Sequence, residues 1–241
     1  MKYSAIFILT TVCMISSYLT IAQNIEVINK SGFQPLEKVN YFSFIEPITD
    51  TTDLKFIATI KVTGETKKEE VAVLFYKLKA KAQELGANAF KLNSFKIIDS
   101  SNKKILILDT YYGTDTAINL NFKNHVKNIV YIFCDAEKSD KTYSFKIDND
   151  KKEIKGGTFY KYQNKEGQKV KINKGGFSGA TLWINWKENK PATFLTLTGF
   201  GLGGAQLPYN QQFGMSFNTG RINYIDGDLG HLLTALLTQS E

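Results

Sequence analysis

The stretch that decides the fold of the first half of the chain is Thr66–Gly86, TKKEEVAVLFYKLKAKAQELG. Its apolar residues recur at steps of three and four, which places them on one face of an α-helix. These residues are Val71, Leu74, Leu78, Ala82 and Leu85. Thr66 and Glu69 form a capping box, in which each side chain accepts a hydrogen bond from a backbone N–H of the first turn. Gly86 supplies the left-handed residue that ends many helices. The stretch therefore predicts one amphipathic helix with a single buried face.

Segments of strand composition flank this helix on both sides. Leu54–Val62 precedes it, and Ala89–Ile98 and Lys104–Tyr112 follow it. The polar cluster Asp99–Asn102 between the last two suits a hairpin loop. The order is β-α-β-β, and a helix packed on a small sheet buries its apolar face. We therefore predict a β-α-β-β domain over residues 54–112.

The end of the helix also carries a family resemblance. Lys79–Phe90, KAKAQELGANAF, followed by strands, resembles the small β-α-β-β domains of bacterial cell-envelope and stress proteins. It is similar to the YbjQ-type heavy-metal-binding domain and to the Rcs outer-membrane stress-sensor lipoprotein, whose helices end in a comparable Leu-Gly-Ala-Asn-Ala segment. The resemblance covers only about residues 54–112 and implies this fold and a place in the cell envelope. The same stretch contains no His and no Cys, so it offers no imidazole or thiolate metal ligand.

The second half of the chain has a different pattern, in which short runs of alternating apolar and polar residues are separated by turn residues. This spacing predicts an antiparallel β-sandwich or a barrel-like domain over residues 127–241. Strands are expected at Ile129–Phe133, Thr142–Ile147, Thr158–Tyr162, Lys169–Asn173, Ala180–Lys187, Ala192–Thr198, Phe213–Phe217 and Arg221–Ile225. Asp148–Asp150 is expected to be a hairpin turn.

A leucine stripe near the end of the chain predicts a short C-terminal helix, which Asp228 would cap and which would close one end of the sheet core. The stripe consists of Leu229, Leu232, Leu233, Leu236 and Leu237. Gly113–Asn124 is polar and lacks clear periodicity, so residues 113–126 are expected to be a linker. Residues 23–53 are expected to be an extended lead-in. The predicted fold class is α+β.

The first residues predict export. A single Lys2 precedes an apolar run from Ile6 to Ile15, and Thr20 and Ala22 are small residues at the positions that a signal peptidase requires. We expect residues 1–22 to be a signal peptide and the mature chain to have no transmembrane span. A retained anchor is the alternative, although polar residues interrupt the run before it reaches the ~20 apolar residues of a span. The expected location is the periplasm, the cell envelope or the extracellular space.

The composition points to anionic partners. The chain has a formal net charge of +7 and a pI near 9.1. Lysines crowd the first half of the second domain, between Tyr143, Tyr160 and Tyr162. They are lysines 141, 146, 151, 152, 155, 161, 165, 169, 171 and 174. Either they bind an anionic envelope polymer or they form solvated strand faces. Because export separates the chain from most nucleic acid, no nucleic-acid partner is expected.

Trp183 is the most specific candidate for ligand contact. The period-two rule places Leu182, Ile184 and Trp186 on one face of the strand, and Thr181, Trp183, Asn185 and Lys187 on the other. An exposed Trp beside Asn and Lys can stack on a sugar ring or anchor a partner. The predicted ligand-binding residues are Trp183, Asn185, Lys187, Tyr160 and Tyr162. The alternative is that both faces are covered and Trp183 is only packed.

Two short motifs suggest catalysis without the context that catalysis requires. Gly199–Gly204, GFGLGG, fits a dinucleotide fingerprint, but no helix can begin directly after it because Pro208 and Gly214 follow. Ser178 lies in GFSGA, which is similar to a nucleophile elbow but precedes a strand. With His125 or His231 as base, Ser178 is the basis of a hydrolase alternative. Whether the chain is an enzyme stays open, and no cofactor is predicted.

A metal site has equally little support from spacing. His125, Cys134 and Asp135 lie near one another in the sequence without the spacing of known metal motifs, so no metal site is predicted. Their convergence in space would support a metal-responsive envelope sensor. The main functional hypothesis is an exported, non-catalytic binding or assembly module. Its expected partner is an envelope polymer, a glycan or an envelope protein.

Overall fold

The computed structural model describes residues 25–35, 40–65, 70–134, 139–175, 179–197 and 222–240. Within these ranges the protein contains three α-helices and three sheets, two of them mixed and one antiparallel, and no closed barrel. The α+β class is confirmed. The predicted signal peptide and the Gly199–Gly204 motif lie outside the described residues. None of the described helices is long and apolar enough to cross a membrane.

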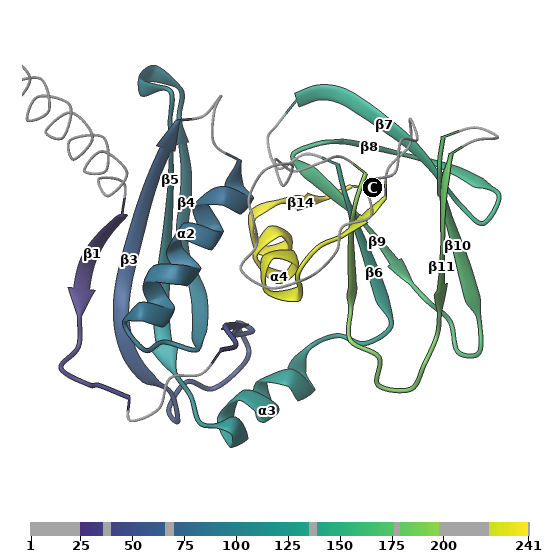
Figure 1. Cartoon of the computed structure of the whole chain (residues 1–241). Helices are drawn as coiled ribbons and strands as arrows, with labels where there is room; N and C mark the ends of the chain where they lie inside the picture. The colour runs from purple at the N-terminus through teal and green to yellow at the C-terminus, as the bar shows by residue number, and fades with distance from the viewer. Residues whose placement is uncertain are drawn as a thin grey trace, which may run out of the picture.

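The first sheet has the strand order β1-β3-β5-β4-β2 (Figure 1). Its strands are β1 (Ile25–Lys30), β2 (Ser43–Phe44), β3 (Lys55–Glu65), β4 (Ala89–Ile98) and β5 (Lys103–Tyr112), with a 3₁₀ turn at Asp99–Ser101 in the β4–β5 hairpin. Because β3 and β4 both pair antiparallel with β5, they run parallel to each other, and a helix connects them. The predicted β-α-β-β order is confirmed. The lead-in contributes the two outer strands.

The connecting helix is α2 (Val71–Glu84), and its predicted apolar face is buried. At its C-terminus the N–H of Gly86 bonds to Gln83 O and the N–H of Ala87 to Ala82 O, which is a Schellman motif. Gly86 has a φ of +92°, as this motif requires. The predicted capping-box residues Thr66 and Glu69 lie outside the described residues. The described helix begins at Val71, with Glu70 as an N-cap that makes no side-chain capping bond.

The expected linker contains a helix, α3 (Asp115–Asn124). The side chain of Thr114 caps it by accepting a hydrogen bond from Ala117 N at 3.4 Å. The buried face of α3 consists of Ala117, Ile118 and Asn121. Because one of these three residues is an amide, the sequence showed no apolar stripe, and the expectation of an irregular segment was wrong.

The second half forms two sheets that face each other. One is antiparallel, with the order β11-β10-β7-β8, and the other is mixed, with the order β13-β12-β6-β9-β14. The strands are β6 (Ile129–Phe133), β7 (Ser139–Ile147), β8 (Asp150–Gly156), β9 (Thr158–Gln163), β10 (Lys169–Lys174), β11 (Ala180–Asn185), β12 (Thr193–Thr196), β13 (Asn223–Tyr224) and β14 (Thr238–Gln239). The prediction of purely antiparallel sheets is wrong for the second one, because β12 runs parallel to β6 and β14 parallel to β9. The expected hairpin turn at Asp148–Asp150 joins β7 to β8, while the expected strand Phe213–Phe217 lies outside the described residues.

β6, with the sequence IVYIF, is buried at every position because both faces of its sheet are covered. Val130 and Ile132 face the antiparallel sheet and pack with Phe145, Val170 and other residues of that sheet in one core cluster. The alternate residues of β6 belong to a second, larger cluster. That cluster also contains the buried residues of α2 and of the first sheet, so it draws on both predicted domains.

The C-terminal helix α4 (Gly227–Leu236) lies between the two halves of the molecule (Figure 1). Its residues Leu229, Leu232 and Leu233 are fully buried in the larger cluster, so the leucine stripe is confirmed. The helix contacts β12 on one side and β2 and β4 on the other, instead of closing one end of a sheet core. Its N-cap is Asp226, whose side chain accepts a hydrogen bond from Asp228 N, so the predicted cap at Asp228 is wrong.

Candidate functional site

Trp183 lies on the outer face of the antiparallel sheet. Its neighbours Leu182 and Ile184 point into the core between the two sheets, and Trp183 itself is 51% exposed. The predicted alternation along β11 is therefore confirmed. The alternative that Trp183 is buried by a second layer does not hold among the described residues.

The outer face around Trp183 carries an excess of positive charge. Strand pairing places three residues of each strand on it: Thr142, Ser144 and Lys146 from β7, Lys151, Glu153 and Lys155 from β8, Lys169, Lys171 and Asn173 from β10, and Thr181, Trp183 and Asn185 from β11. We call this set the basic face. Its one acidic side chain, Glu153, forms an ion pair with Lys151 at 2.8 Å. The other lysines of the face leave it with a net positive charge.

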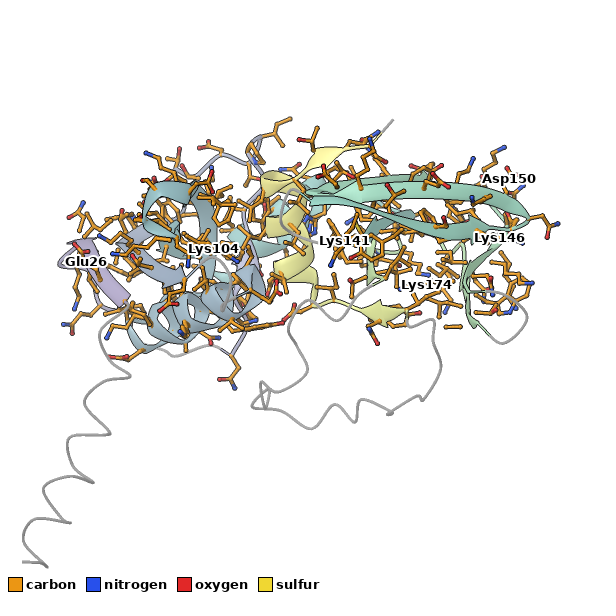
Figure 2. The ribbon with its side chains drawn as sticks, turned by 90° about the horizontal axis from the view of Figure 1, so that it is seen from above. Glu26, Lys104, Lys141, Lys146, Asp150 and Lys174 are labelled. Atoms are coloured by element: carbon orange, nitrogen blue, oxygen red, sulfur yellow. The ribbon has the colours of Figure 1, made fainter. Side chains whose placement is uncertain are left out.

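Two of these lysines contact Trp183 directly. Lys171 is its partner across the β10–β11 pair, and the Nζ atoms of Lys169 and Lys171 lie 4.7 and 5.6 Å from the centroid of the indole ring. At these distances a cation is attracted to the face of the ring. Figure 2 shows Lys146 and Asp150 towards the far end of the β7–β8 hairpin. Lys174 is excluded from the face, because its ammonium turns inward and donates a hydrogen bond to Leu197 O.

The five predicted ligand-binding residues do not share one surface. Asn185 lies on the basic face beside Trp183, and the exposed Lys187 follows the end of β11. Tyr160 and Tyr162 instead pack against the core cluster between the sheets. Burial raises the pKa of the Tyr162 phenol. The sequence could not show that the tyrosines lie apart from Trp183 and Asn185. That depends on the pairing of β9 with β6 in the other sheet, which joins residues distant in the sequence.

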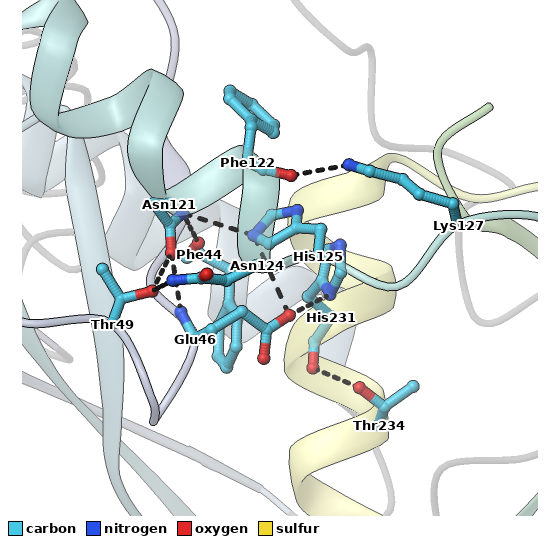
Figure 3. A network of polar contacts seen from close by, with 10 residues as sticks. All are labelled: Phe44, Glu46, Thr49, Asn121, Phe122, Asn124, His125, Lys127, His231 and Thr234. Carbon is cyan, nitrogen blue, oxygen red and sulfur yellow. Dashed lines mark hydrogen bonds and ion pairs between the residues drawn. The ribbon is translucent and has the colours of Figure 1, made fainter. Parts of the chain in front are cut away.

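The two histidines, the only ones in the chain, lie side by side, with His125 buried and the His231 side chain 12% exposed. Their ring centroids are 4.3 Å apart, and the carboxylate of Glu46 lies against both (Figure 3). Glu46 Oε1 is 3.4 Å from His231 Nδ1 and 3.8 Å from His125 Nε2. Glu46 follows β2, His125 is the C-cap of α3, and His231 lies in the second turn of α4. Three segments far apart in the sequence thus form one polar cluster.

Asn121 holds this cluster in place. Its Oδ1 accepts hydrogen bonds from Glu46 N at 3.0 Å and from Thr49 Oγ1 at 2.9 Å. Its Nδ2 donates to Phe44 O at 2.8 Å and lies 3.2 Å from His125 Nε2. Asn121 is fully buried and lies one helical turn before His125, so α3 delivers both residues to the same place.

Burial sets the electrostatics of the cluster. It lowers the pKa of His125, and it lowers the pKa of His231 to about 3, with the neighbouring His125 as a second cause. Both imidazoles are therefore neutral at neutral pH. Burial also raises the pKa of Glu46.

Sequence reasoning named both histidines as candidates but did not pair them with each other or with Glu46. Asp135 and Ser178 lie outside the described residues, so the serine-based hydrolase alternative stays untested. Cys134 is buried in the core between the sheets, and its thiol donates to Lys155 O at 3.1 Å. No sequence pattern identified Glu46 as a candidate, because its partners His125 and His231 are distant from it in the sequence.

In comparisons with known proteins, no family model matches the chain, and neither a curated protein nor a solved structure is significantly similar to it. The resemblance of residues 54–112 to envelope β-α-β-β domains therefore stays a prediction. None of the three residues of the polar cluster lies within that stretch.

Proposed function

We propose that this chain is an exported, non-catalytic binding module of the cell envelope that holds an anionic polysaccharide on its basic face. The observation that carries the proposal is the exposed indole of Trp183 with Lys169 and Lys171 beside it. Export rests on the signal peptide expected at residues 1–22.

The chemistry of the basic face favours a charged glycan over other polyanions. Side chains on one face of a sheet stand about 7 Å apart along a strand and about 5 Å apart between strands, so the lysines form a fixed array of charges. An aromatic ring presents a flat apolar surface on which the C–H face of a sugar ring can stack. A polymer of sugars that also carries carboxylate or phosphate groups uses both features.

The test is binding of the purified chain to an acidic polysaccharide such as polygalacturonate, with uncharged dextran as the matched ligand. The chain has two tryptophans, so fluorescence reports on Trp183 and Trp186 alone. We expect binding to polygalacturonate only, with weakening as the salt concentration rises, because exposed charges are screened within about 10 Å at 0.1 M salt.

Two variants locate the contact. Lys169→Glu/Lys171→Glu should weaken binding by about tenfold or more, since each exposed ion pair contributes roughly 0.2–1 kcal/mol and reversal turns attraction into repulsion. Trp183→Ala should weaken it by about fivefold, the equivalent of roughly 1 kcal/mol of ring contact. Lys123→Glu/Lys161→Glu makes the same change in net charge away from the basic face, and Trp186→Phe changes the other tryptophan, which follows the end of β11.

Equal losses in the two charge-reversal variants would show that only net charge matters and would refute a site on the basic face. Absence of binding to any acidic polysaccharide, together with cross-linking of residue 183 to an envelope protein, would replace the polymer with a protein partner.

A further inference from the structure

The separations within the polar cluster of Glu46, His125 and His231 fit a metal ion better than they fit direct hydrogen bonds. One donor atom from each residue lies within 4.8 Å of the other two. Glu46 Oε1 lies 3.4 Å from His231 Nδ1 and 3.8 Å from His125 Nε2, and both distances are longer than the roughly 2.7–3.2 Å of a usual N–H···O hydrogen bond. In a tetrahedral site with metal–ligand bonds of about 2.1 Å, neighbouring donors are about 3.4 Å apart. The two distances from Glu46 are close to that value, and the donor atoms of the two histidines lie within 4.8 Å of each other.

The hydrogen bonds of Asn121 fix which nitrogen of His125 carries the lone pair. Because Oδ1 of Asn121 accepts from Glu46 N and Thr49 Oγ1, its Nδ2 must be the atom that faces His125 Nε2. An N–H donor there requires an unprotonated Nε2. A metal ion at Nε2 replaces this one contact, while the bond from Nδ2 to Phe44 O stays in place.

The cluster combines one carboxyl group with two imidazoles. Glu46 is half-buried, and among the described residues the only ionisable side chains within ion-pair distance of it are the two histidines. A metal ion binds carboxylate oxygens and unprotonated imidazole nitrogens, so this set of groups can hold one.

Aromatic rings hold the imidazoles in position. Phe44 stacks on His231 with an interplanar angle of 4°, and Phe194 packs edge-on against the same ring at 4.8 Å. Phe122 packs edge-on against His125 at 5.1 Å. Such contacts orient the ligands before an ion arrives, and the apolar shell strengthens their electrostatic attraction to it.

We propose that Glu46, His125 and His231 bind one divalent first-row transition-metal ion, for which Zn²⁺ is the fitting probe. Two imidazoles and a carboxylate suit zinc and its neighbours, whereas Mg²⁺ and Ca²⁺ prefer oxygen donors throughout. Three protein ligands leave at least one coordination position open. The site joins the lead-in, α3 and α4, and it is independent of the basic face.

Histidine-selective NMR tests the proposal directly, because the chain has only two histidines and both lie in the site. Full-length chain labelled with ¹⁵N-histidine is stripped with a chelator and titrated with Zn²⁺. We expect saturation at one equivalent, with the ring nitrogens that shift being Nε2 of His125 and Nδ1 of His231. Mg²⁺ and Ca²⁺ at the same concentrations should leave both rings unchanged.

Calorimetric titration with Zn²⁺ measures the contribution of each ligand. Glu46→Gln, which keeps the shape of the side chain, and His231→Gln should each raise the dissociation constant by at least a hundredfold. Asn121→Ala removes only the orienting contacts and should raise it by about 10–100-fold. Lys123→Ala, on the exposed side of α3, is the matched control and should leave it unchanged.

The proposal is overturned if Zn²⁺ does not bind at one equivalent, or if it binds equally well to the Glu46→Gln/His231→Gln double variant while that variant keeps its folded circular dichroism spectrum. If a ligand variant fails to fold, the NMR titration of the unaltered chain decides alone, since ring nitrogens that do not shift contradict the site.

Discussion

Gly230 brings α4 into direct contact with β12. A Cβ built on this residue would overlap the ring of Phe194, so only glycine lets the helix lie this close to the strand. The close approach also places the next residue, His231, against the same ring. One missing methyl group therefore helps to determine where the imidazole lies.

Gly230→Ala should destabilise the protein. Alanine gains up to about 1 kcal/mol of intrinsic helix preference, but forcing a side chain into a filled core costs about 1–3 kcal/mol. The overlapped atoms belong to a buried ring on a strand. We therefore expect the free energy of unfolding to fall by about 1–2 kcal/mol, measured with urea on protein from which a chelator has removed metal ions. Gly227→Ala, where the new Cβ meets nothing within 4 Å, is the control and should be neutral. A neutral Gly230→Ala would mean that α4 can move away from β12 without cost.

The outward direction of Trp183 on β11 was predicted correctly from the sequence, whereas the direction of Tyr160 and Tyr162 was not. Period-two alternation is a local property of the backbone, so it gave the correct outward direction of Trp183. It could not show that Tyr160 and Tyr162 lie on the other sheet and point inward. That depends on which strands pair, and strand pairing joins residues that are distant in the sequence.

At the scale of elements, an ion-pair cluster joins the start of α4 to α2. Lys79 Nζ lies 3.1 Å from Asp228 Oδ2 and 3.4 Å from Asp226 Oδ2. Burial, together with the neighbouring charge of Asp226, raises the pKa of Asp228 to about 6, and Lys79 only partly offsets this. Burial and the same two carboxylates also raise the pKa of Tyr76. The helix junction is thus less stable when Asp228 is ionised.

This junction predicts a pH dependence with a defined sign. An Asp whose folded pKa lies above its ordinary value of 3.8 holds a proton in the native state that the unfolded chain has lost. Its contribution to stability is therefore lost as the pH rises from about 4 to about 6. We therefore compare the free energy of unfolding of Asp228→Asn with that of the unaltered chain, measured with urea. The difference in favour of the variant should grow by on the order of 2 kcal/mol between pH 4 and pH 7.5.

A second variant separates the causes. Asp226→Asn keeps an oxygen at the N-cap but removes the charge next to Asp228. In this variant the free energy of unfolding should change less with pH than in the unaltered chain, but it should still change. If the difference between Asp228→Asn and the unaltered chain does not change with pH, Asp228 does not titrate in this range.

Elements with an apolar repeat were predictable, and those without one were not. α2 has an apolar residue at every third or fourth position and β6 is a continuous apolar run, and both elements were expected from the sequence. β8, DKKEIKG, was missed because its one large buried apolar residue is Ile154, so most of its order comes from pairing with β7. α3 was missed because Asn121 takes a core position and is satisfied by partners that the sequence does not place beside it.

At the scale of the molecule, the larger core cluster extends across both predicted domains. It contains Leu78 of α2, Phe90 of β4, Tyr131 of β6 and Leu232 of α4, all buried. Neither half can therefore expose this surface to water without losing the burial of apolar side chains that stabilises both.

We accordingly expect one cooperative unfolding transition. Tryptophan fluorescence reports on β11 and amide hydrogen exchange on α2, and the two probes should give the same midpoint in urea. Cutting the chain between the two predicted domains, near residue 113, should leave fragments that fail to fold alone. Two separate transitions, with α2 protected while the fluorescence has already changed, would instead indicate two independent domains.

The sequence by itself determined the α+β class, the β-α-β-β order, the amphipathic face of α2, the alternation along β11 and the leucine stripe of α4. These follow from periodicity, which is set by the geometry of the backbone within one element. Only the tertiary structure decided the mixed sheet, the shared core and the meeting of Glu46, His125 and His231. Those features depend on which elements pack together, and burial there changes the chemistry of a side chain in a way that no local pattern records.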